Sequence, residues 1–214
     1  MIEWIKNRSR QGTIRGILSS FVFLMLLNAF IPVGRFLAWI HFTSLPTVPH
    51  QKIPGWALPI GFFVLLAAMW GWEIFFRGFI LRFFLKRFSW QQALLLHTVV
   101  LNIILIPLLW QTGAAMKEMG MVRFFLGENL FELFLALFFL NTGSILAVTF
   151  LHGLCNFIRF LMVSDAGGPF PTRYFYVADS DAFYWLYLAM GLGMVVLQLW
   201  INRKRGMEEL IPSL

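Results

Sequence analysis

The sequence predicts an all-α integral membrane protein, a bundle of about six transmembrane helices. Three observations support this fold class: 59% of the residues are hydrophobic, 18% are aromatic and only 13% are charged. Charged residues make up about 25% of an ordinary soluble domain. A chain of 214 residues also has too little interior to bury 25 Phe, 9 Trp and 10 Met. The excess apolar side chains are therefore expected to face lipid.

Six apolar stretches are long enough to cross the hydrocarbon layer of a membrane, which takes roughly 20 helical residues. The first follows basic residues, as a signal peptide does, but its apolar part is too long and lacks a small-residue cleavage site, so we expect an anchor. We find no repeat and no soluble domain, and we expect one transmembrane domain over residues 1–214. The predicted spans are residues 14–33, 56–81, 90–110, 124–140, 144–163 and 182–201.

The positions of Lys and Arg predict that both termini are cytoplasmic, because cytoplasmic loops carry the excess of these residues. With six spans, the N-terminus, the second loop and the C-terminus hold twice as many as the other side. The cytoplasmic set is Lys6, Arg8, Arg10, Arg15, Arg82, Lys86, Arg87, Arg203, Lys204 and Arg205. The opposite set is Arg35, Lys52, Lys117, Arg123 and Arg173. The net charge of +7 is thus expected at the membrane flanks, and no nucleic-acid partner is expected.

Local signals mark several helix ends. The segment Ser89–Gln92 has the form of a capping box, so a helix is expected to begin at Trp90. Residues 141–144 form a turn signal that ends in Ser144, the expected N-cap of the next helix. Residues 164–181, rich in Gly, Pro and Asp, are expected to form a long outer loop.

Polar side chains inside the predicted spans mark the candidate site. An ionisable group at the centre of a membrane helix costs roughly 2.5–3.5 kcal/mol or more, so each one needs a partner or a function. The candidates are Glu73, Arg77, His97, Asn102, Glu128, Glu132, His152, Asn156 and Arg159.

Two pairs have the spacing that places side chains on one helical face. Glu73 and Arg77 are four residues apart, as are His152 and Asn156. The first pair is either an ion pair that lets the helix insert or a carboxylate that acts as a general base beside a guanidinium. The second pair either links helices by hydrogen bonds or donates two hydrogen bonds to an oxyanion.

The depth of these groups follows from the helix rise of 1.5 Å per residue. His97 and His152 each lie eight residues after an expected N-cap, Ser89 and Ser144. If both caps lie at the same interface, the two rings are at equal depth, ~12 Å into the membrane, which favours a shared site. Glu73 would then lie ~12 Å deeper than His97, unless the basic segment before Ser89 bends.

Residues 73–82 (EIFFRGFILR), 141–147 (NTGSILA) and 152–156 (HGLCN) resemble the CPBP (Abi, CAAX-protease-like) family of intramembrane endopeptidases. The first segment is similar to that family's Glu-Glu-x-x-x-Arg helix and the last to its His-x-x-x-Asn helix. The resemblance covers roughly residues 56–159. It implies a multi-helix protein that cleaves peptide bonds inside or beside the bilayer.

The resemblance also implies roles for individual residues. In that family a motif glutamate activates water, and histidines and an asparagine hold the oxyanion. Carried over by position, Glu73 corresponds to the family's second glutamate, Arg77 to its arginine, His152 to its last histidine and Asn156 to its asparagine. In our leading hypothesis Glu73 is the base, Arg77 orients its carboxylate, His97 and His152 polarise the carbonyl group, and Asn156 donates to the oxyanion.

The sequence departs from the family pattern in two places. The family's first glutamate, usually assigned as the base, is Trp72 here. The middle Phe-x-x-x-His motif is represented only by Ala93 and His97, and its histidine would be expected near Ile104 or Leu105.

Three hypotheses accommodate Trp72. In the first, Glu73 has taken over as the base. In the second, Glu128 or Glu132 supplies the missing carboxylate, although the predicted topology places both toward the outer face. In the third, catalysis is lost and the protein binds and protects a partner's transmembrane helix. A transporter is disfavoured, since no matching pair of broken helices is found.

The leading expectation is an intramembrane endopeptidase of the glutamic type, in a prokaryotic cell (inner) membrane. Its expected partners are the lipid bilayer and a membrane protein or peptide cleaved near its C-terminal or transmembrane segment. We expect no cofactor and no metal, but a zinc-dependent variant stays open, because Glu73, His97 and His152 are also zinc-ligand types.

Overall fold

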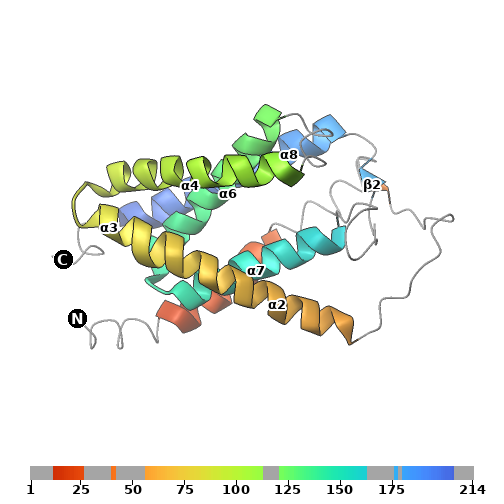
Figure 1. Ribbon diagram of the computed structural model, residues 1–214, viewed down its shortest axis with the longest axis horizontal. Coiled ribbons are helices and arrows are strands. Elements are labelled where there is room, and N and C mark those ends of the chain that lie inside the picture. Colours follow the sequence, from red (N-terminus) through yellow and green to blue (C-terminus); the bar gives the residue numbers. More distant parts are fainter. Residues whose placement is uncertain are drawn as a thin grey trace.

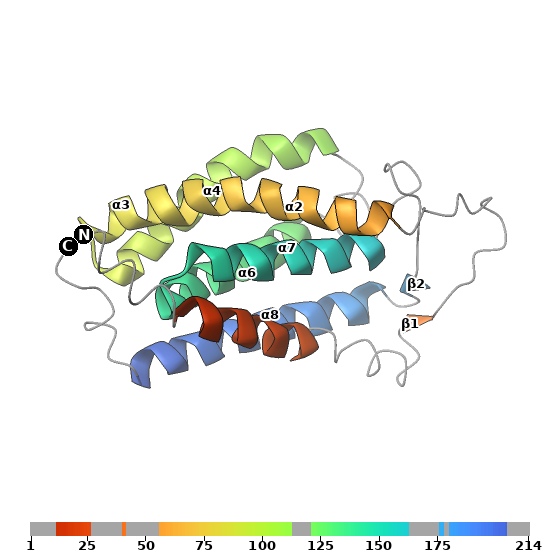
Figure 2. The same cartoon turned by 90° about the horizontal axis from the view of Figure 1, so that it is seen from below.

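The computed structural model describes residues 12–26, 40–41, 56–112, 121–162, 176–177 and 180–204. Within these ranges the chain is almost entirely helical, and successive long helices run in alternating directions (Figures 1 and 2). The prediction of an all-α fold is confirmed. The elements are helix Gly12–Leu26, β1 (Ile40–His41), α2 (Ala57–Glu73), the π-helix η1 (Ile74–Leu81), α3 (Arg82–Leu85), α4 (Trp90–Thr112), α6 (Met121–Thr142), α7 (Ile145–Met162), β2 (Tyr176–Val177) and α8 (Ser180–Lys204).

The helices agree with the predicted spans, and the apolar composition makes the chain an integral membrane protein. Among the described residues, three helices are long and apolar enough to cross a membrane: Pro59–Leu85, Trp90–Pro107 and Phe125–Thr142. Three shorter apolar helices accompany them: Gly12–Leu26, Ile145–Phe157 and Leu188–Arg203. Residues 27–33 of the first predicted span lie outside the described ranges.

The capping box at the start of α4 is confirmed. The backbone N–H of Ser89 donates to Gln92 Oε1 at 3.2 Å, and the backbone N–H of Gln92 lies 3.5 Å from Ser89 Oγ. These reciprocal contacts satisfy backbone donors that a helix N-terminus leaves unpaired. Helix α4 therefore begins at Trp90, as predicted.

The turn between α6 and α7 is also confirmed. Gly143 has φ = 63°, a left-handed conformation that glycine adopts without steric cost, and its N–H donates to Phe139 O at 2.7 Å. Ser144 is the N-cap of α7, because its Oγ accepts from the N–H of Ala147 at 3.2 Å. The turn thus sets where α7 begins, and with it the position of His152.

Helix α6 lies at the centre of the bundle. Its residues 134–139 are all buried, so this part of the helix is covered on every side. Phe23 of the first helix packs edge-on against Phe134 and Phe138, at ring-centroid distances of 5.2 and 5.8 Å. Other helices expose large apolar side chains, as lipid-facing surfaces do, among them Phe63, Val64, Trp70, Leu95, Val99 and Ile103.

Small residues bring the first helix close to the α6–α7 turn. A Cβ atom on Gly16 would lie 2.5 Å from Ala147 Cβ, and one on Gly12 would lie 2.3 Å from Thr142 O. Thr13 Oγ1 and Ser144 Oγ are 2.7 Å apart, within hydrogen-bond distance. Small residues at such contacts let membrane helices pack closely, because lipid provides no hydrophobic driving force for association.

A two-stranded antiparallel ladder, which the sequence did not predict, lies outside the bundle. Ile40 pairs with Val177 and His41 with Tyr176. The ladder ties the chain beyond the first helix to part of the predicted outer loop. Most of that loop, including Arg173 and Tyr174, lies outside the described residues.

The α3–α4 turn and the α6–α7 turn do not end at the same level of the bundle. The start of Gly12–Leu26, the α3–α4 turn, the α6–α7 turn and the end of α8 all lie toward one end of the bundle (Figures 1 and 2). The α3–α4 turn extends further toward that end than the α6–α7 turn in both views. The alternating order agrees with the predicted topology, whereas the assignment of this end to the cytoplasm stays a prediction.

We predict that Gly16→Ala destabilises the bundle, because its methyl group would collide with Ala147. The control is Gly193→Ala, since nothing described lies within 4 Å of a Cβ atom at that position. Relative to the control, the free energy of unfolding in detergent should fall by about 1–3 kcal/mol, the usual cost of overpacking. Equal stability of the two variants would contradict this contact.

Candidate active site

The centre of the candidate site is a contact between α2 and α7. His152 Nδ1 lies 2.5 Å from Glu73 Oε1, so the two helices that carry the sequence motifs meet at these side chains. The helices run antiparallel, and one turn away Asn156 Nδ2 donates to Met69 Sδ at 3.2 Å. The four-residue spacing on each helix therefore aligns Met69 and Glu73 with Asn156 and His152.

Close packing permits this contact. A Cβ atom on Gly153, next to His152, would lie 2.6 Å from Leu66 Cδ2 of α2. Phe62 and Phe157 pack edge-on one turn further along, with their centroids 5.2 Å apart. The absence of a side chain at Gly153 thus lets the backbone of α7 approach α2 closely enough for a direct hydrogen bond.

Arg77 joins a second carboxylate to this pair. Its Nη1 donates to Glu73 Oε1 at 3.0 Å, and its Nη2 donates to the carboxylate Oε2 of Glu132 and, at 3.3 Å, to Glu132 O. The guanidinium therefore bridges α2–η1 and the central helix α6. Glu132 is thus brought beside the motif pair, because α6 passes next to Arg77, whereas its placement toward the outer face stays a prediction.

The cluster is buried and compact. Glu73 and Arg77 are 0% exposed, and Glu132 and His152 are 5% exposed. With both carboxylates ionised, Glu73, Arg77 and Glu132 together carry a charge of −1. Because unbalanced charge is costly away from water, these groups need the hydrogen bonds that neighbouring side chains provide.

Two polar atoms of the cluster have no hydrogen-bond partner among the described residues, Glu73 Oε2 and Arg77 Nε. Glu73 Oε1 accepts from both Arg77 and His152, so only one oxygen of this carboxylate is occupied. An unpaired carboxylate oxygen in a buried site needs a hydrogen-bond donor, and a water molecule or a substrate group is the natural partner.

Asn156 is poised to exchange its partner. The thioether sulfur of Met69 is a weak hydrogen-bond acceptor, so little is lost when the amide turns to a stronger one. His152 lies one turn away on the same helix face. The two side chains are therefore close enough to act on one group.

His97 is buried on the other side of an aromatic layer. Its ring packs edge-on against Phe76 at a centroid distance of 6.1 Å, and Phe76 in turn contacts Trp72 at 4.3 Å. Its Nε2 has no hydrogen-bond partner among the described residues. The predicted role of His97 beside His152 stays a prediction.

Glu73 reaches His152 although the sequence predicted it to lie deeper than the two histidines, and no bend in the basic segment is needed. The depth of Glu73 relative to His97 stays a prediction. Helix α2 continues through η1 and α3 to Leu85 without a break. Because the α3–α4 turn extends beyond the α6–α7 turn, Glu73 can lie far from Ser89 and still reach His152 (Figure 1). A π-helix inside a helix often marks a functional site, and here it begins directly after Glu73 and contains Arg77.

A polar seam continues from the cluster along α6. Asn129, one turn before Glu132, accepts a hydrogen bond from Asn102 Nδ2 of α4 at 2.6 Å, and its own Nδ2 donates to Phe125 O at 2.7 Å. Glu132 and Asn129 thus connect α6 to α2–η1 and to α4. Polar links of this kind hold membrane helices in register.

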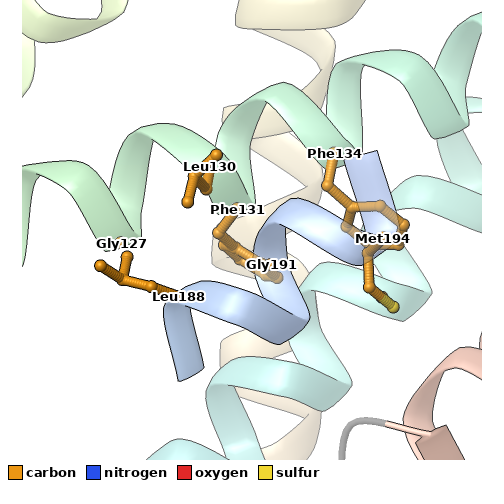
Figure 3. A pocket seen from close by; sticks show the side chains of 7 residues that line it. All are labelled: Gly127, Leu130, Phe131, Phe134, Leu188, Gly191 and Met194. Carbon is orange, nitrogen blue, oxygen red and sulfur yellow. The ribbon is translucent and has the colours of Figure 1, made fainter. Parts of the chain in front are cut away.

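An apolar groove lies between α6 and α8 (Figure 3). The side chain of Phe131 lines the groove and also packs edge-on against the ring of His152, at a centroid distance of 5.5 Å. The groove is lined by Gly127, Leu130, Phe131, Phe134, Leu188, Gly191 and Met194.

The predicted site residues are therefore partly assembled. Glu73, Arg77 and His152 form one cluster and Asn156 is its neighbour, whereas His97 contacts Phe76. No group of three or more His, Cys, Asp or Glu side chains able to hold a metal ion occurs in the described part of the chain. The side chain of Arg159 lies outside the described set. The sequence predicted Glu132 only as an alternative source of the missing carboxylate. Its position as an acidic residue inside an apolar span was the signal that could have identified it.

We predict that Arg77→Met lowers the free energy of unfolding by about 3–5 kcal/mol, because it removes the buried guanidinium that bridges the carboxylates of Glu73 and Glu132. The triple variant Arg77→Met/Glu73→Gln/Glu132→Gln should recover much of this loss, since no buried charge remains among the three positions. Denaturant unfolding in detergent checks both. A stable single variant, or no recovery in the triple variant, would contradict the bridge.

A protein-family model matches the part of the chain that contains this site. Residues 54–158, about half of the chain, match the family model described as type II CAAX prenyl endopeptidase Rce1-like. The matched region contains both sequence motifs and all four residues of the cluster. No curated protein and no solved structure matches the chain. Over residues 54–158 the chain thus belongs to the CPBP/CAAX-protease-like family, whose members are membrane proteases.

Proposed function

We propose that this protein is an intramembrane endopeptidase of the glutamic type in which Glu73 activates the attacking water. The observation that carries the proposal is the state of the Glu73 carboxylate. Oε1 is held by Arg77 and His152, while Oε2 has no partner among the described residues. A general base needs this combination of a fixed orientation and one oxygen that can accept a proton.

The hydrolysis proceeds in two steps. Glu73 Oε2 takes a proton from water as the water oxygen bonds to the scissile carbonyl carbon, and the carbonyl oxygen becomes an oxyanion. The C–N bond then breaks, the carbonyl group reforms, and the proton on Glu73 passes to the leaving nitrogen. Water and one peptide bond are consumed, and a carboxylic acid and an amine are formed.

Asn156 and His152 stabilise the oxyanion. The Nδ1–H of His152 donates to Glu73, so a second proton on Nε2 makes the ring a cation that can donate to the substrate. Asn156 Nδ2 leaves Met69 and donates to the same oxygen. Such donors act strongly where water is excluded.

The proposed substrate is a membrane-associated protein or peptide cleaved near its C-terminal or transmembrane segment, in a prokaryotic cell membrane. The name of the matching family model points to a prenylated C-terminal CAAX sequence as one substrate of this class. Burial of the cluster within the bundle supports a substrate that approaches from the membrane.

We expect Glu73→Gln to lower kcat by about 10²–10⁴-fold, the usual contribution of a positioned general base. Glutamine keeps the volume of the side chain but cannot accept a proton. The assay uses protein in phospholipid vesicles, with one probe a quenched fluorescent farnesylated CAAX peptide and the other an unprenylated transmembrane peptide. A Glu73→Gln variant with wild-type kcat would refute the proposal, and repeating the assay with a chelator tests the zinc-dependent alternative.

Asn156→Ala should lower kcat by about 10²–10³-fold, as removal of an oxyanion donor does. Because this change removes only a weak contact with Met69, the unfolding midpoint should stay close to that of the wild type. His152→Ala should lower kcat at least as much. Unchanged kcat in the Asn156 variant would assign the asparagine to helix packing.

A second candidate function is supported by Trp72, which stands where the family has its first glutamate. In this alternative the protein is inactive and binds a partner's transmembrane helix. It predicts no cleavage of either probe by the wild type, and capture of the intact transmembrane peptide by both wild type and Glu73→Gln. Cleavage that depends on Glu73 decides for the protease.

A further inference from the structure

The geometry points to Glu132 as a positioning residue of the proposed hydrolysis, one that replaces from α6 the second carboxylate missing at Trp72. Glu132 holds the Arg77 guanidinium so that Arg77 orients Glu73 without occupying both of its carboxylate oxygens. This inference rests on the proposed function and extends it to a residue outside both sequence motifs.

The contacts of Arg77 support this role. One nitrogen, Nη2, faces the carboxylate and the backbone carbonyl of Glu132, and the other, Nη1, reaches Glu73 Oε1. The guanidinium is planar, with its donors in a fixed fork, so anchoring one nitrogen fixes the direction of the other. Arg77 is fully buried, and no solvent competes for these donors.

Without the Glu132 carboxylate, Arg77 has a better arrangement available. Arginine and carboxylate groups commonly form two parallel hydrogen bonds. Because Arg77 follows Glu73 by one helical turn, its guanidinium could then cover both carboxylate oxygens of Glu73. The oxygen that accepts a proton from water would be occupied, and the base would be blocked.

Charge balance during the reaction gives a second reason. With a cationic His152, the two carboxylates and Arg77 form a neutral cluster. When Glu73 takes a proton it becomes neutral, and Arg77 keeps an anionic partner only because Glu132 is present. At the same moment His152 gains the oxyanion as its partner. No buried charge is left unpaired at this stage, which lowers the cost of reaching it.

Residues next to Glu132 in the sequence hold this stretch of α6 in place. Asn129, one turn earlier, is tied to Asn102 of α4, and Phe131 packs against the ring of His152. The stretch of α6 that carries Glu132 is therefore held by α4 and α7 as well as by Arg77. A carboxylate on such a stretch can position a guanidinium without itself touching the substrate.

The test compares Glu132→Gln with Glu128→Gln, a change of the same kind one turn earlier on α6. Both are assayed with the two probe peptides in phospholipid vesicles. Glu132→Gln should lower kcat by about tenfold to a hundredfold, as a misplaced catalytic group does, with KM within about twofold of the wild type. Glu128→Gln should keep kcat within about twofold, since the Arg77 bridge is intact.

Glu132→Asp supplies the rescue. It keeps the charge on a shorter side chain, so its kcat should exceed that of Glu132→Gln. If Glu132→Gln fails to fold, Glu132→Asp alone tests the positioning role of Glu132. Its kcat should fall at constant KM, and this loss is compared with that of Glu128→Asp.

Each outcome decides the inference. A wild-type kcat in Glu132→Gln, an equal loss in Glu128→Gln, or a change confined to KM overturns it while the proposed function stands. A wild type that cleaves neither probe overturns the proposed function, and the role of Glu132 falls with it.

Discussion

The hydrogen bond between Glu73 and His152 is the interaction on which the rest of the site depends. Inside an apolar bundle a carboxylate cannot find water on its surface, so it must be satisfied by side chains of neighbouring helices. Glu73 meets this demand with one oxygen, which accepts from His152 of α7 and from Arg77 one turn away. The same contact brings α2 and α7 together at a fixed register, and the second oxygen has no partner among the described residues.

This demand extends to the central helix. Arg77 is as costly to bury as Glu73, and its second nitrogen is satisfied by Glu132 of α6. The buried part of α6 carries mostly apolar residues. The carboxylate of Glu132 therefore connects this central helix to the site through Arg77. The Asn102–Asn129 contact continues the polar seam to α4. Stability and the proposed catalysis thus share one chain of polar contacts.

The substitution at Trp72 is understandable in this arrangement. Its indole packs on Phe76, and Phe76 separates it from His97. These rings connect Trp72 to α4, while the second carboxylate near Arg77 comes from Glu132 of α6. The chain belongs to the family over residues 54–158. Its cluster nevertheless includes a residue of α6, whereas the two motifs lie on α2–η1 and α7.

The sequence by itself determined the fold class, the helix boundaries and the two motif pairs, because these depend on local composition, caps and four-residue spacing. Ser89, Gly143 and Ser144 act on their own neighbours, so their effects could be predicted. Only the tertiary structure decided that Glu132 joins Arg77, that His97 faces Phe76, and that the two turns lie at different depths. These outcomes depend on how far each helix slides along the next. That offset is set by packing between distant segments, such as Gly153 against Leu66, and leaves no periodic signal in the chain.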